Sequence, residues 1–299
     1  MLTAGDAPGA GSRHLLVAMP FIFVMLWSTG FIAAKFGLPY APPLTFLVLR
    51  FFGVALLLMP LVALTQAPWP HGRVIDIAVA GVLLHAGYVG GVWCAIKLGM
   101  PAGLAALIAG MQPVLTALAA PIIGEKVRPR QWIGLMLGLC GVALVVLNKI
   151  TAVSLSYESI GLGILGLLGI TIGTLYQKKR CAYFDLRSGT LIQYLASAVI
   201  MLVLAIVFED FDGSLATVQW TPRFIGALIW SIFVLSIGAV FLLFALIRKS
   251  AATRVTSLLY LTPPTTAIMA WIMFGEAFTV VSTAGMAIAV LGVAFVVKK

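Results

Sequence analysis

The chain has 299 residues, of which 62% are hydrophobic and 9% are charged, and its mean hydropathy is +1.13. Soluble domains carry roughly 25% charged residues, so this composition excludes a soluble globular protein. The formal net charge of +10 would suit a nucleic-acid partner, but the positions of the basic residues argue against one.

Apolar stretches of about 20 residues, long enough to cross ~30 Å of hydrocarbon, recur along the whole chain. The connecting segments are short and leave no room for a soluble or nucleotide-binding domain. We therefore predict an all-α membrane protein with ten transmembrane helices, at 15–34, 42–64, 74–97, 101–122, 131–148, 159–177, 190–208, 222–247, 253–274 and 279–297.

The basic residues indicate the orientation of these helices. If the N-terminus is cytoplasmic, fourteen of the 19 Lys and Arg residues fall in cytoplasmic ends and loops, and four fall on the other side. Such a bias is typical of the positive-inside rule and predicts that both termini are cytoplasmic. The basic excess therefore reports orientation, and we expect no nucleic-acid partner.

The sequence contains an internal repeat. Residues 83–148, shifted by 151 positions, fall on residues 234–299 without a gap. The shift places Gly87 on Gly238, Pro113 on Pro264, Gly124-Glu125 on Gly275-Glu276, and Gly134 on Gly285. We predict two repeats of five helices each, at 1–148 and 149–299.

The second repeat is predicted to be inverted. Five helices are an odd number, so the second copy enters the membrane from the opposite side. The loop after Gly124-Glu125 carries Lys126, Arg128 and Arg130, whereas the equivalent loop, 277–281, carries no basic residue. Inverted-topology repeats are typical of secondary transporters, whose substrate site lies between the halves.

This pattern resembles the EamA-type drug/metabolite transporter family over nearly the whole chain. The resemblance is carried by Trp27-Ser28, Arg50, Gln112-Pro113, Gly124-Glu125, Pro263-Pro264 and Gly275-Glu276. The family often has Trp-Gly where this chain has Trp27-Ser28, a change from one small residue to another. Within the family, the chain is most similar to bacterial exporters of aromatic and other neutral amino acids, which implies a multi-pass protein of the bacterial inner membrane.

Two prolines occupy equivalent positions in the repeats. Pro113 and Pro264 are predicted near the centres of their helices, where each removes a backbone hydrogen bond and leaves the carbonyl of Ala109 or Tyr260 without a partner. We expect a hinge or a cavity wall at these points, or else a static kink. Gln112 precedes Pro113 and is then a polar side chain at the depth of the membrane centre.

Polar and aromatic residues inside spans are the candidate substrate contacts. His85 is the only histidine within a span, and Tyr88 lies one turn later on the same helix face. We expect His85 to line the substrate path, with a packing role or a proton-coupling role as alternatives. Trp27, Trp230 and Tyr260 are further candidates for substrate contact, although aromatic residues inside bundles more often belong to the core.

Other residues leave alternatives open. Arg50 either reaches the membrane interface or a helix end, or binds a substrate carboxylate. Glu125 and Glu276 either cap the following helices or bind cationic groups, or they form a gate. The spacing Gly134-x3-Gly138, continued by Gly141, predicts close helix packing, either between repeats or between protomers.

The acidic residues all fall in loops, termini or span edges, so a buried carboxylate for an ion relay is absent from the predicted spans. We therefore expect facilitative, uncoupled export of amino acids or similar small amphipathic metabolites, by alternating access. Efflux of cationic drugs is the alternative, and it predicts a carboxylate in the cavity. An intramembrane enzyme is disfavoured because His85 stands alone, and the cysteines have no metal-ligand spacing. The sequence predicts no cofactor and leaves the oligomeric state open.

Overall fold

The structure is a computed structural model that describes residues 10–100, 105, 108–147, 155–181, 183–274 and 279–297. Within these residues every regular element is helical, which confirms the predicted all-α class. The first half contributes α1 (Ala10–Gly37), α2 (Pro43–Leu64), α3 (Val74–Gly81), η1 (Val82–Gly90), α4 (Gly91–Lys97), α6 (Gln112–Ala119), η2 (Ala120–Ile123) and α7 (Pro129–Leu147). The second half contributes α8 (Tyr157–Arg180), α9 (Leu186–Phe208), α10 (Pro222–Trp230), η3 (Ser231–Ala239), α11 (Val240–Lys249), α12 (Ala252–Ser257), η4 (Leu258–Leu261), α13 (Thr262–Phe274) and α14 (Val280–Val297).

Six helices in the described residues are long and apolar enough to cross a membrane. They are Ala18–Gly37, Pro43–Leu64, Val74–Lys97, Tyr157–Arg180, Leu186–Phe208 and Pro222–Arg248. Shorter apolar helices follow at Gln112–Ile123 and Thr283–Val297. The predicted span 101–122 begins largely on residues outside the described ranges, so the count of ten spans stays a prediction.

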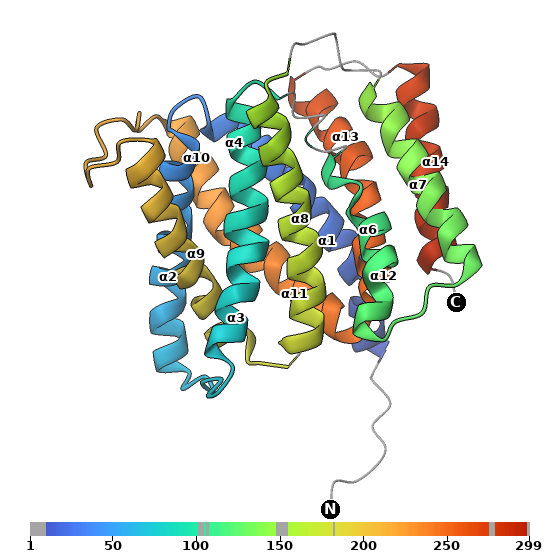
Figure 1. Cartoon of the computed structure of the whole chain (residues 1–299), viewed down its shortest axis with the longest axis horizontal. Helices are drawn as coiled ribbons and strands as arrows, with labels where there is room; N and C mark the ends of the chain where they lie inside the picture. Colours follow the sequence, from blue (N-terminus) through green and yellow to red (C-terminus); the bar gives the residue numbers. More distant parts are fainter. Residues whose placement is uncertain are drawn as a thin grey trace, which may run out of the picture.

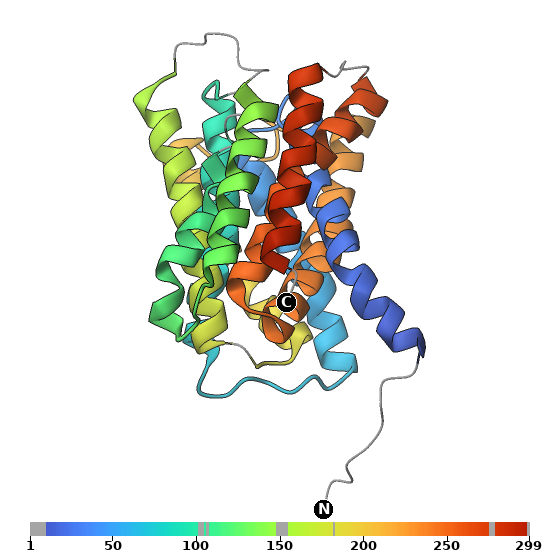
Figure 2. The ribbon, with the colours of Figure 1, turned by 90° about the vertical axis from the view of Figure 1, so that its right-hand side faces the viewer.

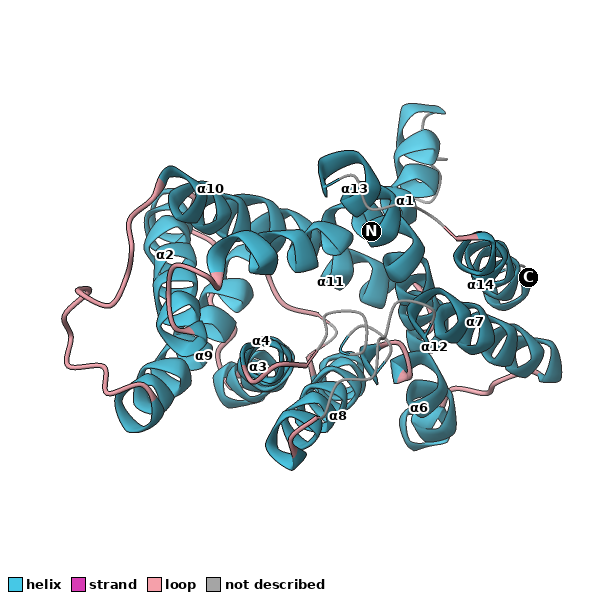
Figure 3. Ribbon diagram, turned by 90° about the horizontal axis from the view of Figure 1, so that it is seen from above, coloured by secondary structure: helices cyan, strands magenta, loops and turns pink. Residues whose placement is uncertain are grey.

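The two halves of the chain interleave. α2 packs along α9, α7 along α14, and α8 along η1 and α4, while α1 packs on α10, η3 and α13. Each of these pairs joins a helix of the first half to a helix of the second half. Viewed from above, α2 and α9 lie at one end of the bundle, and α7 and α14 lie at the other (Figure 3). The space between the halves is therefore enclosed by helices of both.

The α7–α14 pair shows how the two halves are related. A Cβ atom added at Gly134 would come 2.6 Å from the carbonyl oxygen of Gly292, and one added at Gly141 would come 2.6 Å from that of Gly285. Gly134 and Gly285 are repeat equivalents, as are Gly141 and Gly292. The Gly134–Gly292 contact is therefore the repeat equivalent of the Gly141–Gly285 contact. Equivalent helices thus pack antiparallel (Figures 1 and 2), and the glycine stripe joins the two halves of one chain.

α1 begins and α14 ends toward the same end of the bundle (Figure 1). The placement of that end in the cytoplasm stays a prediction.

Two π-helical segments occupy nearly equivalent positions in the repeats. η1 and η3 interrupt the third and eighth predicted spans, and they contain the equivalent glycines Gly87 and Gly238. A π-helical turn is wider than an α-helical turn, and such turns occur frequently at functional sites. η1 carries His85 and Tyr88, and η3 carries Ser236, which is the repeat equivalent of His85.

The prolines were expected to kink continuous helices, and the structure differs. The chain turns at Gly110-Met111, and α6 starts afresh at Gln112, so Pro113 lies in its first turn. In the second half, α12 ends and the tight 3-10 turn η4 precedes α13, whose first turn holds Pro263 and Pro264. Proline is tolerated in a first turn because those N–H groups have no helical partner. Both helices are therefore interrupted before the prolines.

Two glutamates tie the halves together at helix N-termini. Glu125 accepts hydrogen bonds from the backbone N–H of Ala252, at 2.9 and 3.0 Å, at the start of α12. Glu125 was expected to cap the following helix, to bind the cationic cluster or to form a gate, and in the structure it caps a helix of the other half. Glu209, at the end of α9, accepts from the N–H groups of Leu44 and Thr45, both at 2.7 Å, at the start of α2. Glu276 lies outside the described residues.

Candidate substrate-binding site

A cavity lies among α1, α2, the η1–α4 helix and the η3–α11 helix. Its volume is about 550 Å³, including the space at its mouth. Its walls are mainly apolar and aromatic, which is typical of pockets for small organic molecules. The lining residues are Trp27, Gly30, Phe31, Arg50, Leu84, His85, Tyr88, Val89, Val92, Trp93, Leu235 and Val240.

A polar cluster occupies the wall formed by α2, η1, η3 and α9. Arg50 Nε donates a hydrogen bond of 2.9 Å to Ser236 Oγ. The hydroxyl group of Tyr194 donates to the carbonyl oxygen of Ser236 at 3.3 Å, and the ring of Tyr194 stacks on His85 with centroids 4.3 Å apart. His85 is 4% exposed, and its Nε2 atom has no hydrogen-bond partner among the described residues.

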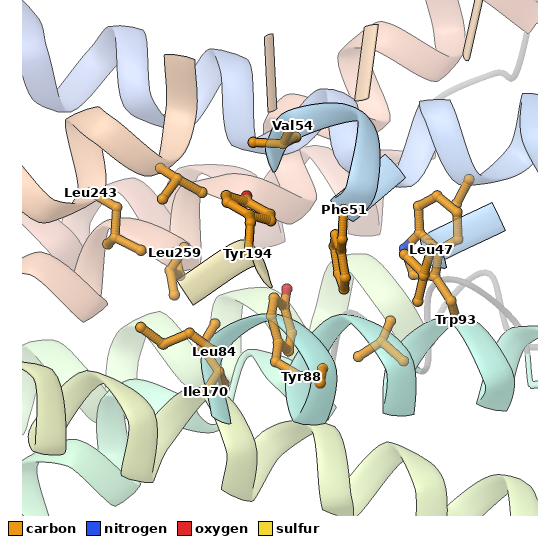
Figure 4. Close-up of a cluster of buried hydrophobic side chains, with 14 of the residues drawn as sticks. Leu47, Phe51, Val54, Leu84, Tyr88, Trp93, Ile170, Tyr194, Leu243 and Leu259 are labelled. Carbon is orange, nitrogen blue, oxygen red and sulfur yellow. The ribbon is translucent and has the colours of Figure 1, made fainter. Parts of the chain in front are cut away.

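Aromatic side chains surround the polar cluster. Trp27 and Tyr88 are nearly parallel, with ring centroids 6.2 Å apart and an interplanar angle of 5°. Phe51 contacts both His85 and Tyr194 from α2, with centroids 6.1 and 5.4 Å away. Tyr88, Phe51 and Tyr194 converge from η1, α2 and α9 on a common space (Figure 4). The site thus combines polar groups with aromatic surfaces.

A second, smaller cavity of about 290 Å³ adjoins the first and shares Trp27, Phe31 and Tyr88 with it. Both helix interruptions face this cavity. Its remaining lining residues are Ala109, Gly110, Gln112, Ile170, Leu259, Thr262 and Pro263. The interrupted backbone of each repeat therefore borders the same space, as irregular backbone inside a membrane must do.

Gln112 is held at the floor of the second cavity. Its amide nitrogen Nε2 donates to Thr174 Oγ1 at 3.2 Å and to the carbonyl oxygen of Ile170 at 3.4 Å. Its oxygen Oε1 is buried and has no partner among the described residues, and neither has the hydroxyl group of Thr262. Two hydrogen-bonding groups at the helix interruptions are therefore free to contact a ligand or water.

The structure brings together four of the predicted contact residues, namely His85, Tyr88, Gln112 and Trp27. It places Trp230 elsewhere, 43% exposed on α10, with its indole Nε1 bonded to Thr29 Oγ1 at 2.8 Å. Tyr260 is fully buried against Gly138 of α7, outside both cavities. Neither Trp230 nor Tyr260 lines either of the two cavities.

The predicted hinge residues have different surroundings. Pro113 is buried within the bundle, in the first turn of α6. Pro264 lines an apolar outer groove between α1, α13 and α14, whereas its neighbour Pro263 faces the second cavity.

Arg50 was expected to reach the membrane interface or a helix end, or else to bind a substrate carboxylate. It is 6% exposed and lines the central cavity, so its side chain does not reach the surface of the bundle. Its partner Ser236 could be suspected from the sequence only through its equivalence to His85. Trp93 was not singled out, although it lies eight residues after His85 on the same span.

The cavity walls carry no acidic side chain among the described residues. Asp76 accepts a hydrogen bond from the Tyr176 hydroxyl group, and Asp185 pairs with Arg187 at 2.7 Å. Within the described ranges, no three His, Cys, Asp or Glu side chains gather as a metal site requires.

A helical bundle with apolar spans, two interleaved halves and a central cavity defines this chain as a membrane transport protein. The sequence model of the EamA-like transporter family matches residues 14–147 and again residues 158–298. The chain therefore belongs to the EamA-like transporter family, and the family unit occurs in it twice.

Several curated proteins are similar over most of their length. The uncharacterized transporter YvbV of Bacillus subtilis is 28% identical over 92% of this chain and 89% of its own. A probable amino-acid metabolite efflux pump of Salmonella typhimurium is 27% identical over 92% of each chain. The uncharacterized inner membrane transporter YedA of Escherichia coli K12 is 24% identical over 95% of this chain and 92% of its own. One crystal structure superposes with a TM-score of 0.75, at 21% identity, over 95% of this chain and 96% of that chain, which shows a shared fold.

Proposed function

We propose that this protein exports amino acids with aromatic or large neutral side chains across a bacterial plasma membrane. The observation that carries the proposal is that the first cavity is lined both by the Trp27–Tyr88 stack and by Arg50 and His85, with Ser236 bonded to Arg50. An amino acid carries an ionic head and, in this class, an apolar side chain, and the polar and aromatic residues of the cavity suit these two parts. The name of the Salmonella relative agrees with this substrate class.

The transport cycle that we propose is alternating access between two inverted repeats, 1–148 and 149–299. The cavity lies between the halves, and the interruptions before α6 and α13 let those helices bend as one half rocks against the other. Glu125 joins the halves at the end of the bundle that carries Lys126, Arg128 and Arg130. We infer that this end is cytoplasmic and that the Glu125 contact opens when the cavity faces the cytoplasm.

Efflux of lipophilic cations is the competing function within transport. A cation in the cavity would need a carboxylate or an unopposed aromatic cage. The cavity instead holds the guanidinium group of Arg50, and its described walls hold no carboxylate. Coulomb repulsion in a site of low dielectric disfavours a second cation there.

The proposal is tested by export from bacterial cells that express the chain. Cells fed a phenylalanine-containing dipeptide accumulate phenylalanine, and the excreted amount is measured over time. We expect faster excretion with the wild-type chain than with an empty vector, and a loss of this gain in Tyr88→Ala. Trp230→Phe, at an exposed residue outside both cavities, serves as the matched control and should excrete phenylalanine as fast as the wild type. Excretion equal to the empty vector, with the protein present in the membrane, would refute the proposed function.

A further inference from the structure

Arg50 is a buried positive charge without a counter-ion. The side chain is 6% exposed and sits well inside α2, within the apolar part of the bundle. Among the described residues, no carboxylate forms an ion pair with it. Glu209, which caps the first turn of the same helix, already uses both of its oxygen atoms on the backbone groups of Leu44 and Thr45. Burial of an unpaired charge is costly, so Arg50 calls for an anionic partner.

The guanidinium group is fixed in place and only partly used. Its Nε atom donates to Ser236 Oγ at 2.9 Å, and the side chain of Tyr194 is a second hydrogen-bonding neighbour. Its Cζ atom lies 5.8 Å from the centroid of the Phe51 ring and 6.0 Å from that of the Trp93 ring. A guanidinium group has five N–H donors in a planar fork that matches a carboxylate. The donors that remain are held at the wall of the cavity without a carboxylate partner among the described residues.

We propose that Arg50, positioned by Ser236, binds the carboxylate of the transported molecule, so that a carboxylate is a required part of every substrate. The inference rests on the proposed function and narrows its substrate class to monocarboxylates. The two residues of this hydrogen bond come from different halves of the chain, since Arg50 belongs to the first half and Ser236 to the second. The bond that orients Arg50 therefore joins the two halves, and the apolar part of the substrate would lie against Trp27 and Tyr88 of the first half.

The proposal predicts which fragment of phenylalanine the cavity recognises. 3-Phenylpropionate keeps the ring and the carboxylate and lacks the ammonium group. 2-Phenylethylamine keeps the ring and the ammonium group and lacks the carboxylate. Each is tested as a competitor of labelled phenylalanine counterflow in liposomes that contain the purified wild-type protein. We expect 3-phenylpropionate to compete and 2-phenylethylamine to fail at a concentration about tenfold higher.

Variants test the residues directly. Arg50→Gln should raise the half-saturating concentration of phenylalanine roughly 30-fold or more, because one partner of a desolvated charged pair is lost. Arg50→Lys should recover part of this loss, since lysine keeps the charge but not the fork. Ser236→Ala removes the 2.9 Å hydrogen bond that orients Arg50 and should have a smaller effect in the same direction. Arg223→Gln, at an exposed arginine of α10, is the matched control and should behave as the wild type.

The outcomes separate this inference from the proposed function. If phenylalanine is transported but the amine competes as well as the acid, the carboxylate site is wrong and the export function stands. If Arg50→Gln does not fold, the wild-type competition and Ser236→Ala decide the question. If the wild type moves no phenylalanine, the proposed function fails. Thermal unfolding then still tests the carboxylate site. We expect 3-phenylpropionate to raise the unfolding temperature of the wild type but not that of Ser236→Ala. No rise in the wild type would overturn the proposal.

Discussion

At the residue scale, the stack of Trp27 on Tyr88 is the feature that we expect to select an aromatic substrate. Both rings line both cavities, so a substrate passing between the cavities moves along them. Tyr88→Ala should raise the half-saturating concentration of phenylalanine about tenfold, because a favourable ring contact contributes about 0.5–1.5 kcal/mol beyond its buried area. Threonine, measured in the same counterflow assay, should be affected less. An equal loss for threonine and phenylalanine would mean that Tyr88 supports the fold and does not select the substrate.

The candidate site could be predicted only in part at this scale. His85, Tyr88, Gln112 and Trp27 were accessible because each is a polar or aromatic residue inside an apolar span, which is unusual enough to be noticed. Trp230 and Tyr260 have the same character and lie outside both cavities, because helix rotation decides which way a side chain points. The role of Arg50 depends on Ser236, 186 residues away in the sequence, and such a pairing is set by tertiary packing.

At the scale of elements, the glycine stripe between α7 and α14 determines how closely the halves approach. A Cβ atom at Gly141 would lie 2.4 Å from the backbone nitrogen of Ala289, a contact that backbone must move to relieve. Gly141→Ala should therefore lower the thermal unfolding temperature, since overpacking costs about 1–3 kcal/mol. Gly161→Ala, in α8 with open space around its Cβ, is the matched control and should be neutral or stabilising. Equal melting curves for the two variants in detergent would contradict this packing.

The interrupted helix before α6 leads to a second prediction at this scale. Pro113→Ala restores an N–H group and allows α6 to extend backward through Gly110-Met111, which would stiffen the proposed bend. We expect slower counterflow with unchanged or higher thermal stability. Pro60→Ala changes a proline inside α2 that faces outward, and it should leave transport unchanged. Faster transport in Pro113→Ala would argue against a hinge at this point.

Most helices could be placed from the sequence, because a span is defined by its own apolar length. The predicted ranges 42–64, 74–97 and 253–274 differ by one residue or less at each end from the helical segments seen in the structure. The breaks inside the predicted spans 101–122 and 253–274 could not be placed in the same way. Proline marks where a helix cannot continue, but the turn at Gly110-Met111 and the 3-10 turn η4 lie just before the prolines, and helix packing selects those positions.

At the scale of the whole molecule, the repeat explains the architecture and the site departs from it. The π-helical segments, the helix interruptions and the α7–α14 glycines all occur in pairs. The polar cluster does not occur in a pair. His85 in one repeat corresponds to Ser236 in the other, and Arg50 is the one arginine among the residues that line the two cavities. In the proposed cycle, the pseudo-symmetric frame would allow the two halves to rock, and the asymmetric cavity within it would recognise an asymmetric substrate.

The charge of the cavity also bears on how transport is driven. A proton- or sodium-coupled carrier needs a titratable or anionic group that the substrate and the ion share. The described cavity walls hold Arg50 and His85 but no carboxylate, so we expect facilitative transport down the substrate gradient. Among the residues that line the cavities, His85 is the one best suited to carry a proton. If transport is uncoupled, flux through His85→Ala should be independent of an imposed proton gradient, as in the wild type.

The most direct test uses the purified protein in liposomes, with labelled phenylalanine, tryptophan and a lipophilic cation measured side by side. Each flux is recorded with and without an imposed proton gradient, and empty liposomes correct for passive entry of the cation. The account predicts flux of both amino acids, equal in the two conditions, and no protein-dependent flux of the cation. Flux of the cation alone would contradict the amino-acid function, and amino-acid flux that requires the gradient would contradict the uncoupled mechanism.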